Sequence, residues 1–278
     1  MSIHFRKSVY EKRGLSMNIL ILTSTSVRHD YLICKLSETF NVIAAIKEDK
    51  GDYYQQESED IRQHMNNFTI TENNYFKPDK NILSLLKENT LNINKNEINS
   101  EYILNWIKAK EVDLIVVFGT SIIRDPLLNA FKNKLINLHM GLSPYYKGSA
   151  TNFWPLVNNE LQCVGGTIHL INSKVDEGPI LYQVRPDIEE GDNCHLIGCK
   201  TIQKTIDELP LVIEKYVQGK IIPQVQLTEG MIYRKRDFNP ESVLKMQENF
   251  VNGIVNKYLI NKKNIDEQFP IFNNNCNI

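Results

Sequence analysis

The 278-residue sequence has no long apolar run and little cysteine, with only five such residues. A membrane-spanning helix needs about 18 or more consecutive apolar residues, so no membrane partner is expected. The cysteines are odd in number and form no Cys-x-x-Cys pair, which favours unpaired thiols in a reducing compartment. We therefore expect a cytoplasmic protein. The basic first residues are not followed by an apolar segment, so residues 1–16 are predicted to be a flexible extension rather than a signal peptide.

An excess of charge of one sign is also missing. The chain carries 32 Lys and Arg residues against 33 Asp and Glu residues, which gives a formal net charge of -1. Binding to tRNA or DNA relies on many cationic contacts with phosphate, so no nucleic-acid partner is expected. Hydrophobic residues make up 42% and charged residues 23% of the chain, which excludes disorder along its whole length.

A convincing set of metal ligands is absent as well. The nearest approach is Cys194, His195 and Cys199, and no second pair of ligands follows at the spacing typical of zinc sites. The sequence therefore predicts no metal, and most of the cysteines are expected to be small core residues.

Short apolar runs alternate with helical patterns through most of the chain. Such runs are typical of strands buried on both faces of a parallel sheet. Their alternation with helices predicts an α/β fold with a doubly wound, Rossmann-like, mostly parallel sheet. Strands are expected over 17–23, 41–47, 111–118, 134–139, 165–171 and 179–184. Helices are expected over 27–38, 55–75, 100–109, 126–131 and 194–218. The Asn-rich stretch 91–97 is predicted to be a surface connection.

The pattern changes after Gly219. Two alternating runs flank a Glu-Gly pair, which predicts a β-hairpin, and an Asn-Pro-Glu helix start follows. The predicted elements are hairpin strands over 221–227 and 231–236, one helix from 239 to about 257, and a frayed tail from 273. We expect a catalytic domain over 17–219 and a small hairpin and helix unit over 220–278.

The stretch that carries most chemical information follows the strand expected over 134–139. Asn137 and His139 are two residues apart, so their side chains point to one face at the carboxyl end of the strand. Ligands of open α/β sheets bind at that end. A loop containing Gly141, Pro144 and Gly148 follows, which favours an open crevice over a packed interior.

An imidazole that acts as a general base needs a partner that sets its tautomer, and a carboxylate commonly serves. Asp176 lies between two expected strands and is the best candidate. A single His or Asp at such a position is more often structural, because Asp also suits turns. The number of residues between Asp176 and His139 does not show whether their side chains make contact.

Four segments in a fixed order carry a resemblance to a known family. They are Asn137-Leu-His139, Leu142-Ser-Pro-Tyr-Tyr-Lys-Gly-Ser149, Gly166-Thr-Ile-His-Leu170 and Val175-Asp-Glu-Gly-Pro-Ile-Leu181. Together they resemble the folate-dependent formyltransferases over residues 17–218. That family includes the phosphoribosylglycinamide, methionyl-tRNA and sugar N-formyltransferases. The chain has Met140 where the family often has Pro.

The resemblance implies both a catalytic set and a formyl donor. The catalytic residues would be Asn137, His139 and Asp176, and the donor would be N10-formyltetrahydrofolate, with no metal. The pterin would lie against two backbone segments. Their residues are Gly119, Thr120, Ser121, Ile122 and Ile123 after one strand, and Ser173, Lys174 and Val175 before Asp176.

Within the family the chain resembles the sugar N-formyltransferases most, because the runs 229–238 and 153–156 are similar to members linked with polysaccharide biosynthesis. This resemblance implies a nucleotide-linked amino sugar as the acceptor. The loop after the first strand, 23–29, has no Gly, unlike the phosphate loop of the glycinamide enzymes. The balanced charge and short C-terminal unit fit methionyl-tRNA poorly. We expect a homodimer formed through the C-terminal unit. Candidate substrate contacts are Arg28, Tyr145, Tyr146 and Trp154.

Three other readings of the sequence stay open. A formyltetrahydrofolate hydrolase would use the same three residues on water. A formyltransferase of the same family would act on glycinamide ribonucleotide or methionyl-tRNA. A non-catalytic folate-binding module would bind without turnover.

Overall fold

The computed structural model describes residues 17–51, 58–226 and 230–273, so the predictions for residues 1–16 and for the end of the tail lie outside the described residues. Contacts divide the chain into two compact units. Of the described residues, the first contains 17–51 and 77–137, and the second contains 58–76, 138–226 and 230–273.

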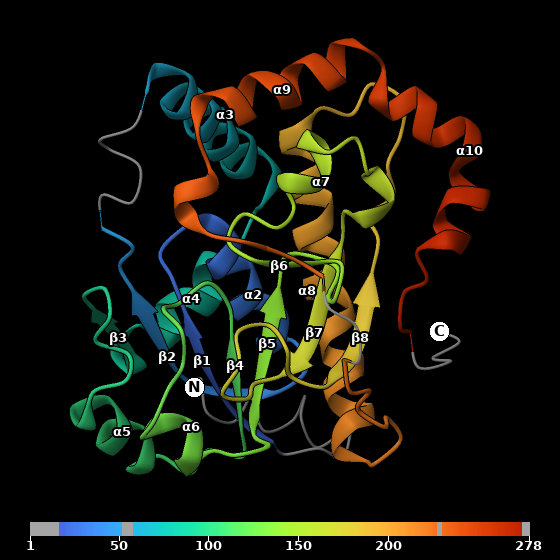
Figure 1. Cartoon of the computed structure of the whole chain (residues 1–278). Helices are drawn as coiled ribbons and strands as arrows, with labels where there is room; N and C mark the ends of the chain where they lie inside the picture. Colours follow the sequence, from blue (N-terminus) through green and yellow to red (C-terminus); the bar gives the residue numbers. More distant parts are fainter. Residues whose placement is uncertain (1–16, 52–57, 227–229, 274–278) are drawn as a thin grey trace. The chain divides into compact units, whose positions relative to one another are not determined.

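The first unit is built on a parallel sheet with the strand order β3-β2-β1-β4-β5 (Figure 1). The strands are β1 (Asn18–Thr23), β2 (Asn41–Glu48), β3 (Thr90–Ile93), β4 (Leu114–Val117) and β5 (Leu135–His139). The last two residues of β5 belong to the second unit. Strands β1 and β4 are almost wholly buried, as their unbroken apolar runs predict. The doubly wound, mostly parallel sheet is therefore confirmed.

Helices connect these strands. They are α2 (Val27–Ser37), α4 (Lys80–Leu86), the short 3-10 helix Lys87–Asn89, α5 (Glu101–Lys108) and α6 (Leu127–Ala130). Helix α5 begins where Ser100 accepts a hydrogen bond from the backbone N–H of Ile103, and α4 begins where Asp79 accepts one from Asn81. Such caps satisfy backbone donors that the first helical turn leaves unpaired.

One prediction in this unit is wrong. Residues 90–93, at the start of the Asn-rich stretch, form strand β3, which pairs with β2 instead of forming a surface connection. The polar composition misleads because β3 is the last strand of the order, and only Ile93 is buried. An edge strand needs one buried side only, so it lacks the apolar run of a central strand.

The strand order has a functional consequence. The chain runs from β1 to β2 and β3 on one side of β1, and then crosses back to β4 on its other side, which makes a topological switch point between β1 and β4. Ligands of doubly wound sheets bind at the carboxyl ends of the strands that flank such a point. In this unit those ends are Thr23 of β1 and Val117 of β4.

The second unit contains an antiparallel pair of strands covered by a long helix. Strand β7 (Gly166–Leu170) pairs with β8 (Ile180–Val184), and α8 (Cys194–Val217) packs against both. Helix α3 (Glu59–Tyr75) packs against α8. These elements agree with the expected strands and helices. The chain reversal between β7 and β8 presents the loop that carries Asp176.

A second core of this unit joins α3 and the segment after β5 to the C-terminal helices. It contains Tyr146, Phe153 and Trp154 together with Phe238 and Met246. The elements are β6 (Tyr146–Gly148), α7 (Trp154–Val157), the 3-10 helices Leu161–Cys163 and Lys235–Asp237, α9 (Pro240–Val251) and α10 (Ile254–Gln268). The C-terminal helices thus share a core with residues 146–156. The functional division at residue 219 stays a prediction.

The predicted C-terminal hairpin is wrong in the described residues. Strand β9 (Met231–Tyr233) pairs in parallel with β6, and Gln224 bridges to Ile180 of β8. Alternating polar and apolar residues identify a strand but not its partner, and here each arm pairs with a distant segment. The expected single helix is also divided in two, because Gly253 adopts a left-handed conformation with φ of +76° between α9 and α10.

Gly148 offers a test of the β6–β9 pairing. Its φ is +94°, and a Cβ there would lie 2.1 Å from the carbonyl oxygen of Tyr233. We expect Gly148→Ala to lower the free energy of unfolding by about 1–2 kcal/mol through the left-handed backbone and by about 1–3 kcal/mol more through overpacking. Chemical denaturation followed by circular dichroism measures the change.

Gly191 supplies the matched control. Its φ is +86°, and a Cβ there would meet no atom within 4 Å. Gly191→Ala should therefore lower the free energy of unfolding only by the amount that the left-handed backbone costs. Equal losses in the two variants would contradict the close approach of β9 to Gly148.

Among the described residues, no helix combines the length and the apolar character that crossing a membrane requires.

Candidate active site

The side chains of His139 and Asp176 meet within the second unit. His139 ends β5 and is only 6% exposed. Its Nδ1 lies 3.4 Å from Oδ1 of Asp176, and its Nε2 lies 3.2 Å from the carbonyl oxygen of Tyr146. Because both ring nitrogens face oxygen acceptors, a neutral ring can donate to only one of them at a time. The imidazole is thus placed to hold or release a proton beside a carboxylate.

Asp176 is held in an unusual backbone conformation. Its φ is +53°, a left-handed value that Asp adopts more readily than most residues. Its Oδ2 accepts a hydrogen bond from the backbone N–H of Gly148 at 3.0 Å. The side-chain amide of Gln226 donates to the carbonyl oxygens of Asp176 and Gly178 at 2.9 and 2.8 Å. Contacts on both the side chain and the backbone therefore fix the carboxylate relative to His139.

Gln226 is a positioning residue that the sequence did not reveal. It lies in the segment between α8 and β9, far along the chain from Asp176, and it forms part of no motif. The bridge between Gln224 and Ile180 brings this segment to the loop after β7. An isolated Gln in a connecting segment carries no signal of such a contact.

A second imidazole lies near the same carboxylate. His169 on β7 is 3% exposed, and its Nε2 lies 3.9 Å from Oδ1 of Asp176. Its Nδ1 donates to the carbonyl oxygen of Leu170 at 2.9 Å, so the neutral ring has no proton left for Asp176. Burial lowers the pKa of His169, while the charge of Asp176 opposes that effect. Of the two rings, His139 is the nearer to Asp176, at 3.4 Å against 3.9 Å.

The neighbouring carboxylate has a different partner. Glu177 pairs with Lys147 at 2.9 Å and with Lys174 at 3.4 Å. The hydrogen bond from Lys147 is the main cause of the lowered pKa of Glu177. Of these two adjacent acids, Asp176 alone is ion-paired with a histidine among the described residues.

Asn137 lies two residues before His139 on β5. It is half-buried, and its backbone pairs in register with Val117 of β4. Asn137 and His139 thus occupy alternate positions of one strand, as predicted. A role for the Asn137 amide in the chemistry stays a prediction.

The two segments predicted to contact the donor are partly exposed loops. Gly119, with φ of +73°, follows β4, and Ser121 is held through its backbone N–H by Glu48. Ile122 is 49% exposed in the first segment, and Val175 is 47% exposed in the second. Each loop therefore leaves a large apolar side chain accessible, which suits contact with a planar ring system. Ser173 and Lys174 are exposed as well.

Two of the predicted substrate contacts are corrected by their burial. Tyr146 is fully buried and Trp154 is 5% exposed. Both rings stack on Tyr233, and the indole N–H of Trp154 donates to the carbonyl oxygen of Ser149. These rings are core residues and present no free face to a substrate. Tyr145 is half-buried and its hydroxyl donates to the carbonyl oxygen of Pro270, so its contact with substrate stays a prediction.

Positively charged side chains lie near the switch point of the first unit. Arg28 lies in the first turn of α2, and Lys50 follows β2. His29 is fully buried, and burial lowers its pKa first, followed by the charges of Arg28, Lys50 and Lys47. The Nζ of Lys50 would lie 3.5 Å from a Cβ at Gly119. Arg28 and Lys50 therefore bring positive charge near the ends of β1 and β4, whereas Lys47 is ion-paired with Asp30.

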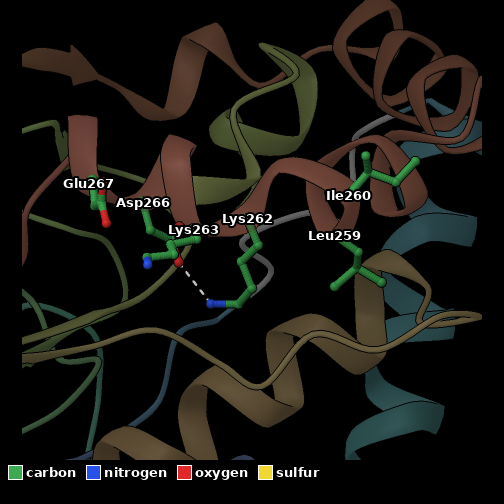
Figure 2. A pocket seen from close by; sticks show the side chains of 6 residues that line it. All are labelled: Leu259, Ile260, Lys262, Lys263, Asp266 and Glu267. Carbon is green, nitrogen blue, oxygen red and sulfur yellow. Dashed lines mark hydrogen bonds and ion pairs between the residues drawn. The ribbon is translucent and has the colours of Figure 1, made fainter.

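A hollow beside α10 is not a second site of this kind. Its walls are six residues of that one helix, Leu259, Ile260, Lys262, Lys263, Asp266 and Glu267 (Figure 2). Lys262 and Asp266 form an ion pair at 2.8 Å across it. A groove along a single helix does not enclose a ligand, and none of the candidate site residues lines it.

The family model described as "Formyl transferase" matches residues 17–213. The chain therefore belongs to the formyl transferase family. This finding confirms the resemblance seen in the four sequence segments. His139 and Asp176 lie within the matched residues.

Similar curated proteins differ in their acceptors. The chain is 32% identical to a methionyl-tRNA formyltransferase of Thermodesulfovibrio yellowstonii, over 44% of this chain and 42% of that protein. It is 28% identical to a phosphoribosylglycinamide formyltransferase of Haemophilus influenzae, over 50% and 63%. It is also 28% identical to a GDP-perosamine N-formyltransferase of Brucella melitensis, over 49% and 52%. The chain thus spans less than two thirds of each of these relatives.

A solved structure shares the fold. A sugar N-formyltransferase from Shewanella sp. FDAARGOS_354 is 21% identical, with a TM-score of 0.54, and the match covers 80% of this chain and 78% of that one. At this identity the likeness concerns the fold alone.

Proposed function

We propose that this formyltransferase moves a formyl group from N10-formyltetrahydrofolate to the amine of a nucleotide-linked amino sugar. The observation that carries the catalytic part is the contact of Nδ1 of His139 with Oδ1 of Asp176 at 3.4 Å, at the end of a strand of a formyl transferase fold. Catalytic hydrogen bonds are often long before substrate binds, so this separation is compatible with an orienting hydrogen bond between the two side chains.

Bound N10-formyltetrahydrofolate would supply the formyl carbon that the acceptor amine attacks. Asn137 would donate its amide N–H to the oxygen on which negative charge develops, and such a donor lowers the barrier by about 2.7–4 kcal/mol. His139 would take up the proton that the amine loses and release it to N10 of tetrahydrofolate, which leaves as its bond to the formyl carbon breaks. Asp176 would orient the His139 ring and stabilise its cation. The residues that would hold the donor are the two loop segments around Ile122 and Val175.

The acceptor assignment rests on two observations. The likeness to the GDP-perosamine N-formyltransferase supports an amino sugar on a nucleoside diphosphate. Arg28 and Lys50 place positive charge at the switch point of the first unit, where a diphosphate would find cationic partners. The relatives that act on methionyl-tRNA and on phosphoribosylglycinamide make those acceptors the competing candidates. A homodimer, a cytoplasmic location and a role in polysaccharide biosynthesis stay predictions.

A panel of acceptors tests this assignment. The purified chain is incubated with N10-formyltetrahydrofolate and one acceptor at a time, and both donor consumption and the mass of the product are measured. The panel contains GDP-perosamine, amino sugars linked to uridine and thymidine diphosphates, glycinamide ribonucleotide and methionyl-tRNA. We expect an N-formyl product with one nucleotide-linked amino sugar only.

The other outcomes separate the alternatives. Formyl transfer to glycinamide ribonucleotide or methionyl-tRNA alone would overturn the proposed acceptor but keep the catalytic roles. Formate release without any amine would identify a hydrolase. Donor binding without turnover of any acceptor or of water would indicate a binding module.

A further inference from the structure

The second unit contains a group of metal-ligating side chains that the catalytic proposal does not use. His64 lies on α3, and Cys194 and His195 are the first two residues of α8. One nitrogen or sulfur atom from each lies within 4.8 Å of the others. The two helices pack against each other, so the group joins segments that are 130 residues apart in the chain.

We propose that His64, Cys194 and His195 bind one divalent transition-metal ion of the zinc type and thereby tie α3 to α8. Two imidazoles and a thiolate are ligands that zinc prefers, and a fourth position would be left for water. The sequence pointed to Cys194 and His195 but paired them with Cys199. In the structure Cys199 is buried elsewhere along α8, and His64 supplies the third ligand.

The distance between the two rings fits a shared ion. Nε2 of His195 lies 3.2 Å from Nδ1 of His64. Two nitrogens bound tetrahedrally at about 2.0–2.1 Å from one zinc ion are separated by about 3.3–3.4 Å. In the bound state the thiol sulfur would lie about 3.5–3.6 Å from each nitrogen, and the three ligand atoms already lie within 4.8 Å of one another. The side chains of adjacent residues inside a helix usually point apart. Cys194 and His195 stand at the first turn of α8, and their ligand atoms lie within 4.8 Å of each other.

Aromatic rings lie beside the two imidazoles of the proposed site. The rings of Phe153 and Phe238 lie 5.5 and 6.1 Å from the His64 ring, and Phe68 stacks on His195 at 6.0 Å. An apolar shell of this kind strengthens electrostatic attraction between an ion and its ligands.

Binding requires two changes in proton position. The proton shared by the two imidazoles would move to the far nitrogen of its own ring, so that both facing nitrogens offer lone pairs. The thiol of Cys194 would lose its proton to solvent and bind as thiolate. No oxidant or reductant is needed.

Cobalt(II) titration of the full chain tests the site. The purified protein is freed of metal with a chelator and titrated with Co²⁺, while the thiolate-to-cobalt charge-transfer absorption is recorded. We expect saturation at one ion per chain and loss of the absorption when Zn²⁺ is added. Zn²⁺ alone should raise the melting temperature.

Variants identify the ligands. Cys194→Ser should abolish the absorption, and His195→Gln should weaken Co²⁺ binding by about 100-fold or more, since even groups that only orient metal ligands contribute about 10- to 100-fold. Cys199→Ala, on the same helix, and Cys34→Ala, in the first unit, should bind as the parent does. Each variant is checked by circular dichroism, and His64→Gln replaces any variant that fails to fold.

Three results would overturn the proposal. One is the absence of the charge-transfer absorption in the folded parent. Another is its persistence in folded Cys194→Ser. The third is an unchanged Co²⁺ affinity in folded His64→Gln or His195→Gln, which would leave the two rings as a simple hydrogen-bonded pair.

Discussion

Replacing His139 by Gln is expected to lower the rate of formyl transfer about 100- to 10 000-fold, the range that a positioned proton-transfer group contributes. Glutamine is similar in size and can still donate a hydrogen bond toward Asp176 or Tyr146. It cannot take up the proton that the amine loses. The effect should therefore appear in kcat, measured with the acceptor that the panel identifies.

Binding of the donor provides the control for His139→Gln. The segments predicted to contact the pterin do not include His139, so the affinity for tetrahydrofolate should stay close to that of the parent. Isothermal titration calorimetry measures it. A folded His139→Gln protein with unchanged turnover would refute the proposed role of the imidazole.

Replacing Asp176 by Asn is expected to reduce kcat about 100- to 10 000-fold as well, because the amide reverses the hydrogen bonding at His139. Asn tolerates the left-handed φ of +53°, so the loop should keep its shape. If the amide oxygen accepts from the N–H of Gly148, its NH2 group faces Nδ1 of His139. The ring would then carry its proton on Nε2. Loss of the orienting carboxylate in a serine protease costs about 10 000-fold for the same reason.

The adjacent acid supplies a matched control. Glu177→Gln removes a carboxylate one residue away that pairs with Lys147 and not with His139. We expect its kcat to stay within a few-fold of the parent value. A loss as large as that of Asp176→Asn would show that general negative charge in the loop, rather than the orientation of His139, supports transfer.

The parallel sheet was predictable because strands buried on both faces need unbroken apolar runs, as in β1 and β4. The site was predictable in part, since Asn137 and His139 share a strand and Asp176 belongs to a recognisable segment. Long-range pairings were not predictable. The pairing of β9 with β6, the hydrogen bonds from Gln226 and the approach of His64 to Cys194 each depend on the path of the folded chain.

The burial of Tyr146 and Trp154 shows a related limit. The local sequence around an aromatic residue near a ligand-binding edge does not show whether its side chain faces a substrate or the core. Here the C-terminal helices cover them, and the sequence around residues 145–154 contains no sign of that cover.

The pairing of β9 with β6 has a consequence for comparisons within the family. Strand β6 supplies both the Tyr146 carbonyl that faces His139 and the Gly148 N–H that binds Asp176, and β9 lies directly beside it. A chimera that exchanges the C-terminal segment between two relatives would therefore also exchange the strand that supports β6 beside His139 and Asp176. A change in acceptor preference in such a hybrid could not be attributed to the transplanted segment without first measuring its intrinsic turnover.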